Sequence, residues 1–323
     1  MNKRIAVIDI GTYSTRLLIS AIHIKETLEE TLKSIEDVLS VGRITALGRG
    51  VKETGILQRE AIEETLSTLK EYVLIAKQYK VEKIIGFATQ ACREAKNGWE
   101  FLEKAKQLGI DVRLISGEEE AYLSFIATAY SIQPETDFVM IDQGGGSTEF
   151  AYGKKENDYK MEKSVSFPFG IVGLTEKFIK TDPPKKEELL QMSRYIKSYL
   201  EKIKDYKQAK TFIGLGGTIT TLVALEKHIY PYSSEKVHGQ VLKKETIKKW
   251  LDKLSSMTIQ ERKSIPQIED KRAEAIIAGI VIFDTALDFF DKDFLIVSDK
   301  GLRHGAVIEE AKKIFKEAKH WNI

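Results

Sequence analysis

Short runs of apolar residues alternate along the chain with stretches in which apolar residues recur every three or four positions. The first pattern is typical of buried strands and the second of amphipathic helices, so their alternation predicts an α/β protein. The clearest helical stretch covers 58–79, where apolar residues from Ile62 to Ala76 recur at helical spacing. Ser116 followed by Glu119 resembles a capping box and marks another helix start.

The same patterns place the remaining elements. The predicted strands cover residues 4–8, 16–24, 83–88, 112–115, 138–141, 211–214 and 294–297. The predicted helices cover 58–79, 116–129, 182–204, 218–225, 273–289 and 302–315. A length of 323 residues suits about two domains. We expect them at 1–124 and 125–323, with packing of the last helix on the first domain allowed.

Composition narrows the class of protein. Hydrophobic residues make up 42% and charged residues 30% of the chain, as in soluble globular proteins. The net charge of +2 predicts neither a nucleic-acid partner nor any other general attraction to polyanions. The first apolar stretch ends at Asp9, and the run 121–134 is shorter than the ~18 residues of a membrane span. One cysteine and no metal-ligand spacing among five histidines argue against disulfides and zinc, so we expect a cytoplasmic protein without membrane contact.

An internal repeat is the most informative feature of the sequence. Residues 8–15 and 141–148 share the form I-D-x-G-x-x-S-T, and each copy lies between two predicted strands. Glycine permits a tight turn that brings backbone N–H groups close to phosphate oxygens, and the hydroxyl groups add donors. The aspartate at each strand end could hold hydrated magnesium or orient water. Ordinary turns with glycine and serine are the alternative, but two equivalent copies favour a pair of phosphate-binding loops that face each other.

These paired loops resemble the phosphate motifs of the actin-like ATPase and sugar-kinase superfamily. More narrowly, the chain resembles the exopolyphosphatase/guanosine pentaphosphate phosphohydrolase (Ppx/GppA) family. The segments that carry this resemblance are 9–17, 88–97, 115–121, 142–149, 214–218 and 298–303. The resemblance implies two duplicated ribonuclease H-like domains with a cleft between them, in the short form of the family. Relative to that form, 25–40 looks like a lengthened hairpin.

The resemblance also suggests which residues bind phosphate. The two loops, two arginines and a glycine-rich turn before a helix supply the donors. The predicted phosphate-binding residues are Gly11, Thr12, Tyr13, Ser14, Thr15, Arg16, Arg93, Gly144, Gly145, Gly146, Ser147, Thr148, Gly216, Gly217 and Thr218. Arginine offers a planar fork to phosphate oxygens and keeps its charge. For the glycine-rich turn, a purely structural role is as well supported as anion binding at a helix start. Lys271 and Arg272 open a later helix, at a place where family members are thought to contact guanosine alarmones.

Hydrolysis of a phosphoanhydride also needs a group that orients or deprotonates water. The resemblance assigns this role to Glu120, in the first turn of a predicted helix. Glu118 and Glu119 compete for it, and an acidic, solvated helix start is the structural alternative. We expect Asp9, Asp142 and Glu149 to hold Mg²⁺ or the attacking water, with Asp142 and Glu149 counted among the catalytic residues.

The predicted function is therefore an exopolyphosphatase that releases orthophosphate from the end of polyphosphate. Hydrolysis of guanosine pentaphosphate to the tetraphosphate is the alternative with the same chemistry. A non-catalytic alarmone or nucleotide sensor is an alternative of another class, although it would not need a base. A sugar kinase or actin-like ATPase is a fourth hypothesis, but neither an acceptor aspartate nor a full adenosine pocket is evident. A homodimer is a further expectation from the resemblance.

Overall fold

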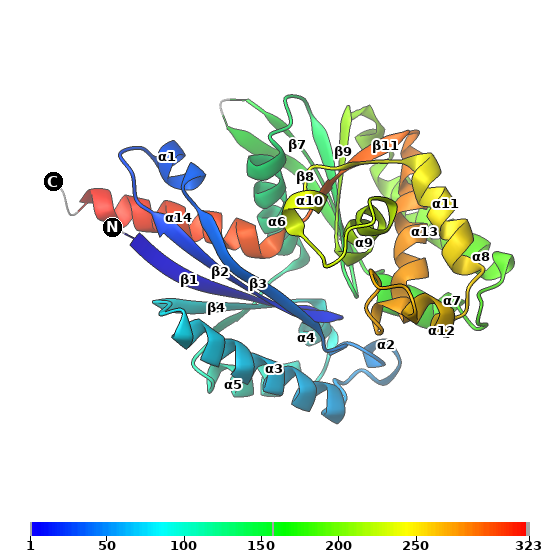
Figure 1. Ribbon diagram of the computed structural model, residues 1–323, viewed down its shortest axis with the longest axis horizontal. Helices are drawn as coiled ribbons and strands as arrows, with labels where there is room; N and C mark the ends of the chain where they lie inside the picture. The colour runs from blue at the N-terminus through cyan, green and yellow to red at the C-terminus, as the bar shows by residue number, and fades with distance from the viewer. Residues whose placement is uncertain (1, 157, 321–323) are drawn as a thin grey trace. The chain divides into compact units, whose positions relative to one another are not determined.

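The computed structural model describes residues 2–156 and 158–320, and its chain forms two compact units. Unit 1 comprises the described residues up to Ala127 and those from Leu302 onward, and unit 2 comprises Thr128–Gly301. Each unit contains one mixed β-sheet with helices (Figure 1). The predicted α/β class is thereby confirmed. The last helix falls within the predicted range of the second domain, with packing on the first allowed, and in the structure it groups with unit 1.

Unit 1 contains a sheet in the order β3-β2-β1-β4-β5. Its strands are β1 (Asn2–Ile10), β2 (Ser14–His23), β3 (Glu36–Ile44), β4 (Lys83–Ala88) and β5 (Asp111–Leu114). Its helices are α1 (Leu28–Lys33), α2 (Val51–Thr54), α3 (Arg59–Gln78), α4 (Gln90–Glu94), α5 (Gly98–Lys106) and α14 (Leu302–His320). Helix α6 (Gly117–Ile132) begins in unit 1, and its residues from Thr128 onward belong to unit 2. The first three strands are antiparallel and the last two run parallel to β1.

Both faces of β1 are buried, which explains its nearly continuous apolar sequence. Ala6 and Ile8 point to the face covered by α3, where Leu69 and Val73 pack against them. On the other face, Val7 packs with residues of α14. Figure 1 shows this helix alongside the strands of the first sheet. Because side chains alternate along a strand, Asp9 lies on the α14 face of the sheet.

Unit 2 contains a sheet in the order β10-β11-β9-β6-β7-β8. Its strands are β6 (Phe138–Gln143), β7 (Thr148–Lys155), β8 (Tyr159–Phe167), β9 (Thr211–Leu215), β10 (Val241–Lys243) and β11 (Phe294–Ser298). Its helices are α7 (Ile171–Phe178), α8 (Lys186–Leu200), the 3₁₀-helix η1 (Glu201–Gln208), α9 (Gly217–Glu226), α10 (Ser234–Val237), α11 (Lys244–Ser255), α12 (Ile259–Lys263) and α13 (Arg272–Phe290).

The buried helix α13 covers one face of this second sheet. Phe290 of α13 lies against Phe150 of β7 and Phe212 of β9, with ring centroids 6.3 and 5.2 Å away. Gly214 of β9 faces α13 too, since a Cβ there would lie 3.0 Å from the ring of Phe283. Strand alternation therefore directs Asp142, which follows the strand partner of Gly214, to the opposite face.

The sequence predictions and the structure differ over 25–40. That stretch contains α1, which opens with a capping box between Thr27 and Glu30, and then enters β3. The predicted lengthened hairpin is thus a helical insertion between two paired strands. The predicted helix over 182–204 also changes character, because α8 ends at Leu200 and η1 follows. Within the described residues, each helix is too short or too polar to cross a bilayer.

Candidate functional site

The two copies of the repeat form the same kind of hairpin, one in each unit. In unit 1, the Gly11 N–H donates to the Ser14 carbonyl over 3.1 Å, between β1 and β2. In unit 2, the Gly144 N–H donates to the Ser147 carbonyl over 2.9 Å, between β6 and β7. The repeat seen in the sequence is therefore also a repeat of backbone conformation.

A later segment of the chain supports each hairpin from behind. In unit 1, the carbonyl of Thr12 accepts from the N–H of Gly48 at 2.8 Å. In unit 2, the carbonyl of Gly145 accepts from the N–H of Val172 at 2.9 Å. Gly170 lies so close to this second hairpin that a Cβ would be 2.4 Å from the carbonyl carbon and oxygen of Gly145. These supporting segments had no motif in the sequence that could have identified them.

The hairpin of unit 2 keeps backbone donors available. Within the described chain, the amide N–H groups of Gly145 and Gly146 donate to no protein acceptor. The neighbouring carbonyls are bonded to the supporting segment, so the turn presents donors without acceptors. Successive backbone N–H groups of this kind form anion-binding concavities.

The side chains of the threonines that end the two repeats are engaged with protein groups, and their phosphate contact stays a prediction. Both side chains are fully buried. The Thr15 hydroxyl lies 3.0 Å from that of Thr45, and the Thr148 hydroxyl donates to the Phe169 carbonyl over 2.7 Å. A hydroxyl has one proton to donate, so the Thr148 side chain has none left for a phosphate oxygen.

We expect Thr148→Val to destabilise the protein without weakening phosphate binding. The substitution keeps the volume but leaves the buried Phe169 carbonyl without its donor, which lowers the free energy of unfolding by about 1–3 kcal/mol. Urea denaturation and the KM for phosphate release measure the two effects separately. A raised KM at unchanged stability would show that the Thr148 hydroxyl contacts the ligand.

The carboxylates of the repeat occupy matching positions with different partners. Asp9 pairs across the strands with Arg16, whereas Asp142 pairs across the strands with Glu149. The second copy therefore has an acidic residue, Glu149, where the first has the basic residue Arg16. Glu149 is only 1% exposed and accepts a hydrogen bond from Ser166 on β8 over 2.7 Å. Ser166 thus lies beside the Asp142–Glu149 pair, although no motif in the sequence singles it out.

Asp142 and Glu149 suit a magnesium ion that has few protein ligands. They do not form a site in which protein groups surround the metal. Mg²⁺ is usually bound by one or two carboxylates together with water and substrate phosphates. In the described part of the chain, no group of three or more His, Cys, Asp or Glu side chains could hold a metal by itself. Two carboxylates on neighbouring strands lie beside amides that favour anions. This arrangement is consistent with a metal ion that binds together with a substrate phosphate.

Glu120 lies in the first turn of α6, beside Arg93 of α4. The Nη1 of Arg93 is 3.5 Å from a Glu120 carboxylate oxygen and donates to the Ile115 carbonyl over 2.5 Å. Glu120 retains 14% of its side-chain exposure. The Glu120 carboxylate thus lies beside a guanidinium and at a helix N-terminus, both of which carry positive charge.

The neighbouring glutamate is placed differently. Glu119 donates its N–H to the hydroxyl of Ser116 over 3.1 Å, as expected at a helix start. Its carboxylate pairs with Arg113 at 3.2 Å and is 38% exposed. Glu119 is thus engaged with Ser116 and Arg113 at the helix start. These contacts distinguish it from Glu120, which the sequence alone could not do.

The glycine-rich turn of unit 2 opens α9 next to an arginine. A Cβ on Gly217 would lie 2.1 Å from Nη1 of Arg272, so the guanidinium lies directly over the helix start. Gly216 has a φ of 113° and lies against the Gln143 carbonyl, which requires glycine. Thr218, by contrast, is buried with its hydroxyl against Gly279, and its phosphate contact stays a prediction.

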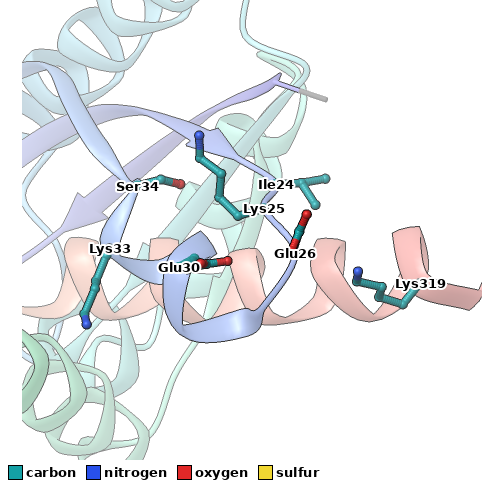
Figure 2. Close-up of a pocket in the computed structure, with 7 residues that line it drawn as sticks. All are labelled: Ile24, Lys25, Glu26, Glu30, Lys33, Ser34 and Lys319. Carbon is teal, nitrogen blue, oxygen red and sulfur yellow. The ribbon is translucent and has the colours of Figure 1, made fainter.

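Two other features are not part of this site. Burial raises the pKa of the Cys92 thiol to about 12, so it does not supply a thiolate nucleophile. A surface hollow of about 860 Å³ lies by α1 and the end of α14, at the other end of β2 from its hairpin (Figure 2). Its lining includes Lys25, Lys33 and Lys319 together with Glu26 and Glu30, so the charges are mixed.

Residues 23–314 match the sequence profile of the Ppx/GppA phosphatase family. The crystal structure of the Aquifex aeolicus member of that family is 46% identical, with a TM-score of 0.81, and the match covers 97% of this chain and 99% of that one. These matches agree with the actin-like fold expected from the sequence.

Two curated relatives extend the comparison. A bifunctional 3-dehydroquinate synthase/phosphatase of Fusobacterium nucleatum is 35% identical over 94% of this chain. The match covers 46% of that protein, so this chain spans about half its length. Exopolyphosphatase 2 of Mycobacterium tuberculosis is 31% identical over 95% of this chain and 98% of its own length.

Proposed function

Because the chain belongs to the Ppx/GppA phosphatase family and is a hydrolase of that kind, we propose that it is an exopolyphosphatase. The reaction is hydrolysis of the terminal phosphoanhydride bond of polyphosphate, with release of orthophosphate. The observation that carries the proposal is the repeated hairpin geometry. Among the described residues, the Gly145 and Gly146 amides of the second hairpin have no protein acceptor, and they lie beside Asp142 and Glu149. The similarity of M. tuberculosis exopolyphosphatase 2 over nearly its whole length supports it.

In this proposal Glu120 accepts a proton from the attacking water. Its carboxylate is partly exposed, and Arg93 holds it in place from the side. Proton acceptance in the transition state requires an ionised acid within hydrogen-bonding reach of water. Phosphoryl transfer otherwise depends on positioning and charge stabilisation, which amides and guanidinium groups supply.

Asp142 and Glu149 are proposed to hold Mg²⁺ together with a substrate phosphate. When bound, Mg²⁺ neutralises charge on phosphate oxygens and fixes their orientation. The Ser166 hydroxyl keeps one Glu149 oxygen in place through its 2.7 Å hydrogen bond. Asp9 remains a proposed contributor from unit 1, where Arg16 is its cross-strand partner.

Hydrolysis of guanosine pentaphosphate is the second candidate function. The start of α9 supports it, because it offers a second position for an anion. β9 and β6 are neighbouring strands, so this helix start lies about one strand spacing, ~4.8 Å, from the strand that enters the hairpin. Arg272 over Gly217 makes it a second anion position within unit 2. Two such positions suit either successive phosphates of a chain or the separate phosphate groups of an alarmone.

The products made from polyphosphate of uniform length test the proposal. With magnesium, we expect orthophosphate and chains shortened from one end, resolved by gel electrophoresis. Guanosine tetraphosphate should inhibit no better than tripolyphosphate if the site is shaped for a phosphate chain. Fragments from internal cleavage would contradict exopolyphosphatase action, and far stronger inhibition by guanosine tetraphosphate would favour the alarmone substrate.

A further inference from the structure

Arg262 is a buried charged residue that lies outside the site described above. It belongs to the five-residue helix α12 and is only 2% exposed. Burial lowers the pKa of its guanidinium, because the charged form loses hydration. Buried charges persist in proteins when partners satisfy them. The contacts of Arg262 therefore indicate what its burial achieves.

The Arg262 guanidinium connects three segments of unit 2. Its Nη2 lies 3.1 Å from a carboxylate oxygen of Asp182, in the segment before α8. Its Nη1 donates to the carbonyl of Ala273, in the first turn of α13, over 2.8 Å. Asp182 in turn accepts from the N–H of Ile259, at the start of α12, over 2.9 Å. The pair thus fixes the first turn of α13 to two other segments.

The residue directly before Ala273 is Arg272. Its side chain is 11% exposed and lies 3.5 Å from Glu269. Its guanidinium lies over Gly217 at the start of α9, as the short distance from a Cβ at Gly217 shows. A shift in the first turn of α13 would move the Arg272 backbone and withdraw the guanidinium from α9.

We propose that Arg262 is a positioning residue that, together with Asp182, holds Arg272 over the N-terminus of α9. The inference rests on the proposed function, in which that helix start and Arg272 bind a phosphate group of the substrate. Arg262 itself is bonded to protein groups and does not contact the ligand. Its effect on ligand affinity passes through Arg272.

The test measures binding of methylenediphosphonate, a non-hydrolysable diphosphate analogue, to the full chain by calorimetry. Arg262→Met and the milder Asp182→Asn should each weaken binding about tenfold, within the range seen for residues that act through a packed network. Arg272→Ala should weaken it at least as much. In an Arg272→Ala background, neither substitution should weaken binding further.

Gly217→Ala displaces Arg272 by another route. The added methyl group takes the place of the guanidinium, and alanine is favourable inside a helix. It should weaken binding while the melting temperature stays near that of the native protein. Thr285→Val is the matched control in α13, because it removes a partly buried 3.0 Å hydrogen bond to Ser193, more than three helical turns along α13 from Arg272. It should lower the melting temperature and leave binding unchanged.

Three outcomes decide the inference. Loss of binding in Arg262→Met and Asp182→Asn that disappears in the Arg272→Ala background supports it. Equal losses with and without Arg272 would overturn it, because the effect would then not pass through that side chain. Native affinity in Arg272→Ala would overturn it too. Phosphate release by the native protein tests the proposed function separately, since it does not depend on how Arg272 is held.

Discussion

Replacing Glu120 by glutamine is expected to lower kcat for orthophosphate release by about 10²–10⁴-fold, the usual contribution of a general base. Glutamine has nearly the same shape and can still accept a hydrogen bond from Arg93, which lies 3.5 Å from the carboxylate. The fold should therefore be kept, and circular dichroism with thermal denaturation verifies this. Steady-state release with magnesium measures the loss.

Glu119→Gln is the matched control for this experiment. Glu119 lies in the same helical turn, and its carboxylate pairs with Arg113 at the surface. Removal of such an exposed pair changes stability by about 0–1 kcal/mol. We expect its kcat to stay near that of the native protein. If Glu119→Gln lost activity and Glu120→Gln retained it, the two roles would have to be exchanged.

Gly170→Ala is expected to combine a loss of stability with a loss of catalysis. The added Cβ would lie 2.4 Å from the carbonyl group of Gly145 and 2.5 Å from the N–H nitrogen of Gly146, so the backbone of the hairpin has to move. Overpacking of this kind costs about 1–3 kcal/mol. A displacement of about 1 Å in a positioning group can reduce turnover about 100-fold. Urea denaturation and kcat/KM measure the two losses.

Two further glycines test the cause of this effect. Gly48 supports the hairpin of unit 1, but a Cβ there would meet the side chain of Thr12, at 2.3 Å, rather than backbone. Because a side chain can move more easily, Gly48→Ala should have the smaller effect. Gly214→Ala crowds Phe283 in the core and should reduce stability with little loss of kcat. A kcat loss in Gly214→Ala as large as in Gly170→Ala would contradict the role of hairpin position.

The sequence was sufficient to predict features that depend on local pattern. The strand at 83–88 and the helix over 58–79 follow from runs and periods of apolar residues, and the structure has β4 and α3 there. The two hairpins follow from the repeat, because glycine and serine at the same spacing favour the same turn. The sequence could not decide which unit contains the final helix, because the helix packs on Val7, which is distant in the sequence.

The features that the sequence missed depend on contacts between distant residues. Thr148 looked like a phosphate ligand because its hydroxyl could serve one, yet the Phe169 carbonyl takes its proton. Neither Ser166 nor Arg262 lies in a motif that the sequence shows. Their roles arise from Glu149 and Asp182, which lie next to them only after folding.

The central claim is tested most directly by orthophosphate release from polyphosphate and from guanosine pentaphosphate, with magnesium, by the native protein. The account predicts release from polyphosphate at a rate that the Glu120→Gln variant reduces by at least about 100-fold. Faster release from guanosine pentaphosphate would assign the alternative substrate within the same chemistry. Release from neither substrate would contradict the hydrolase function proposed for this chain, and binding without turnover would then favour a sensor.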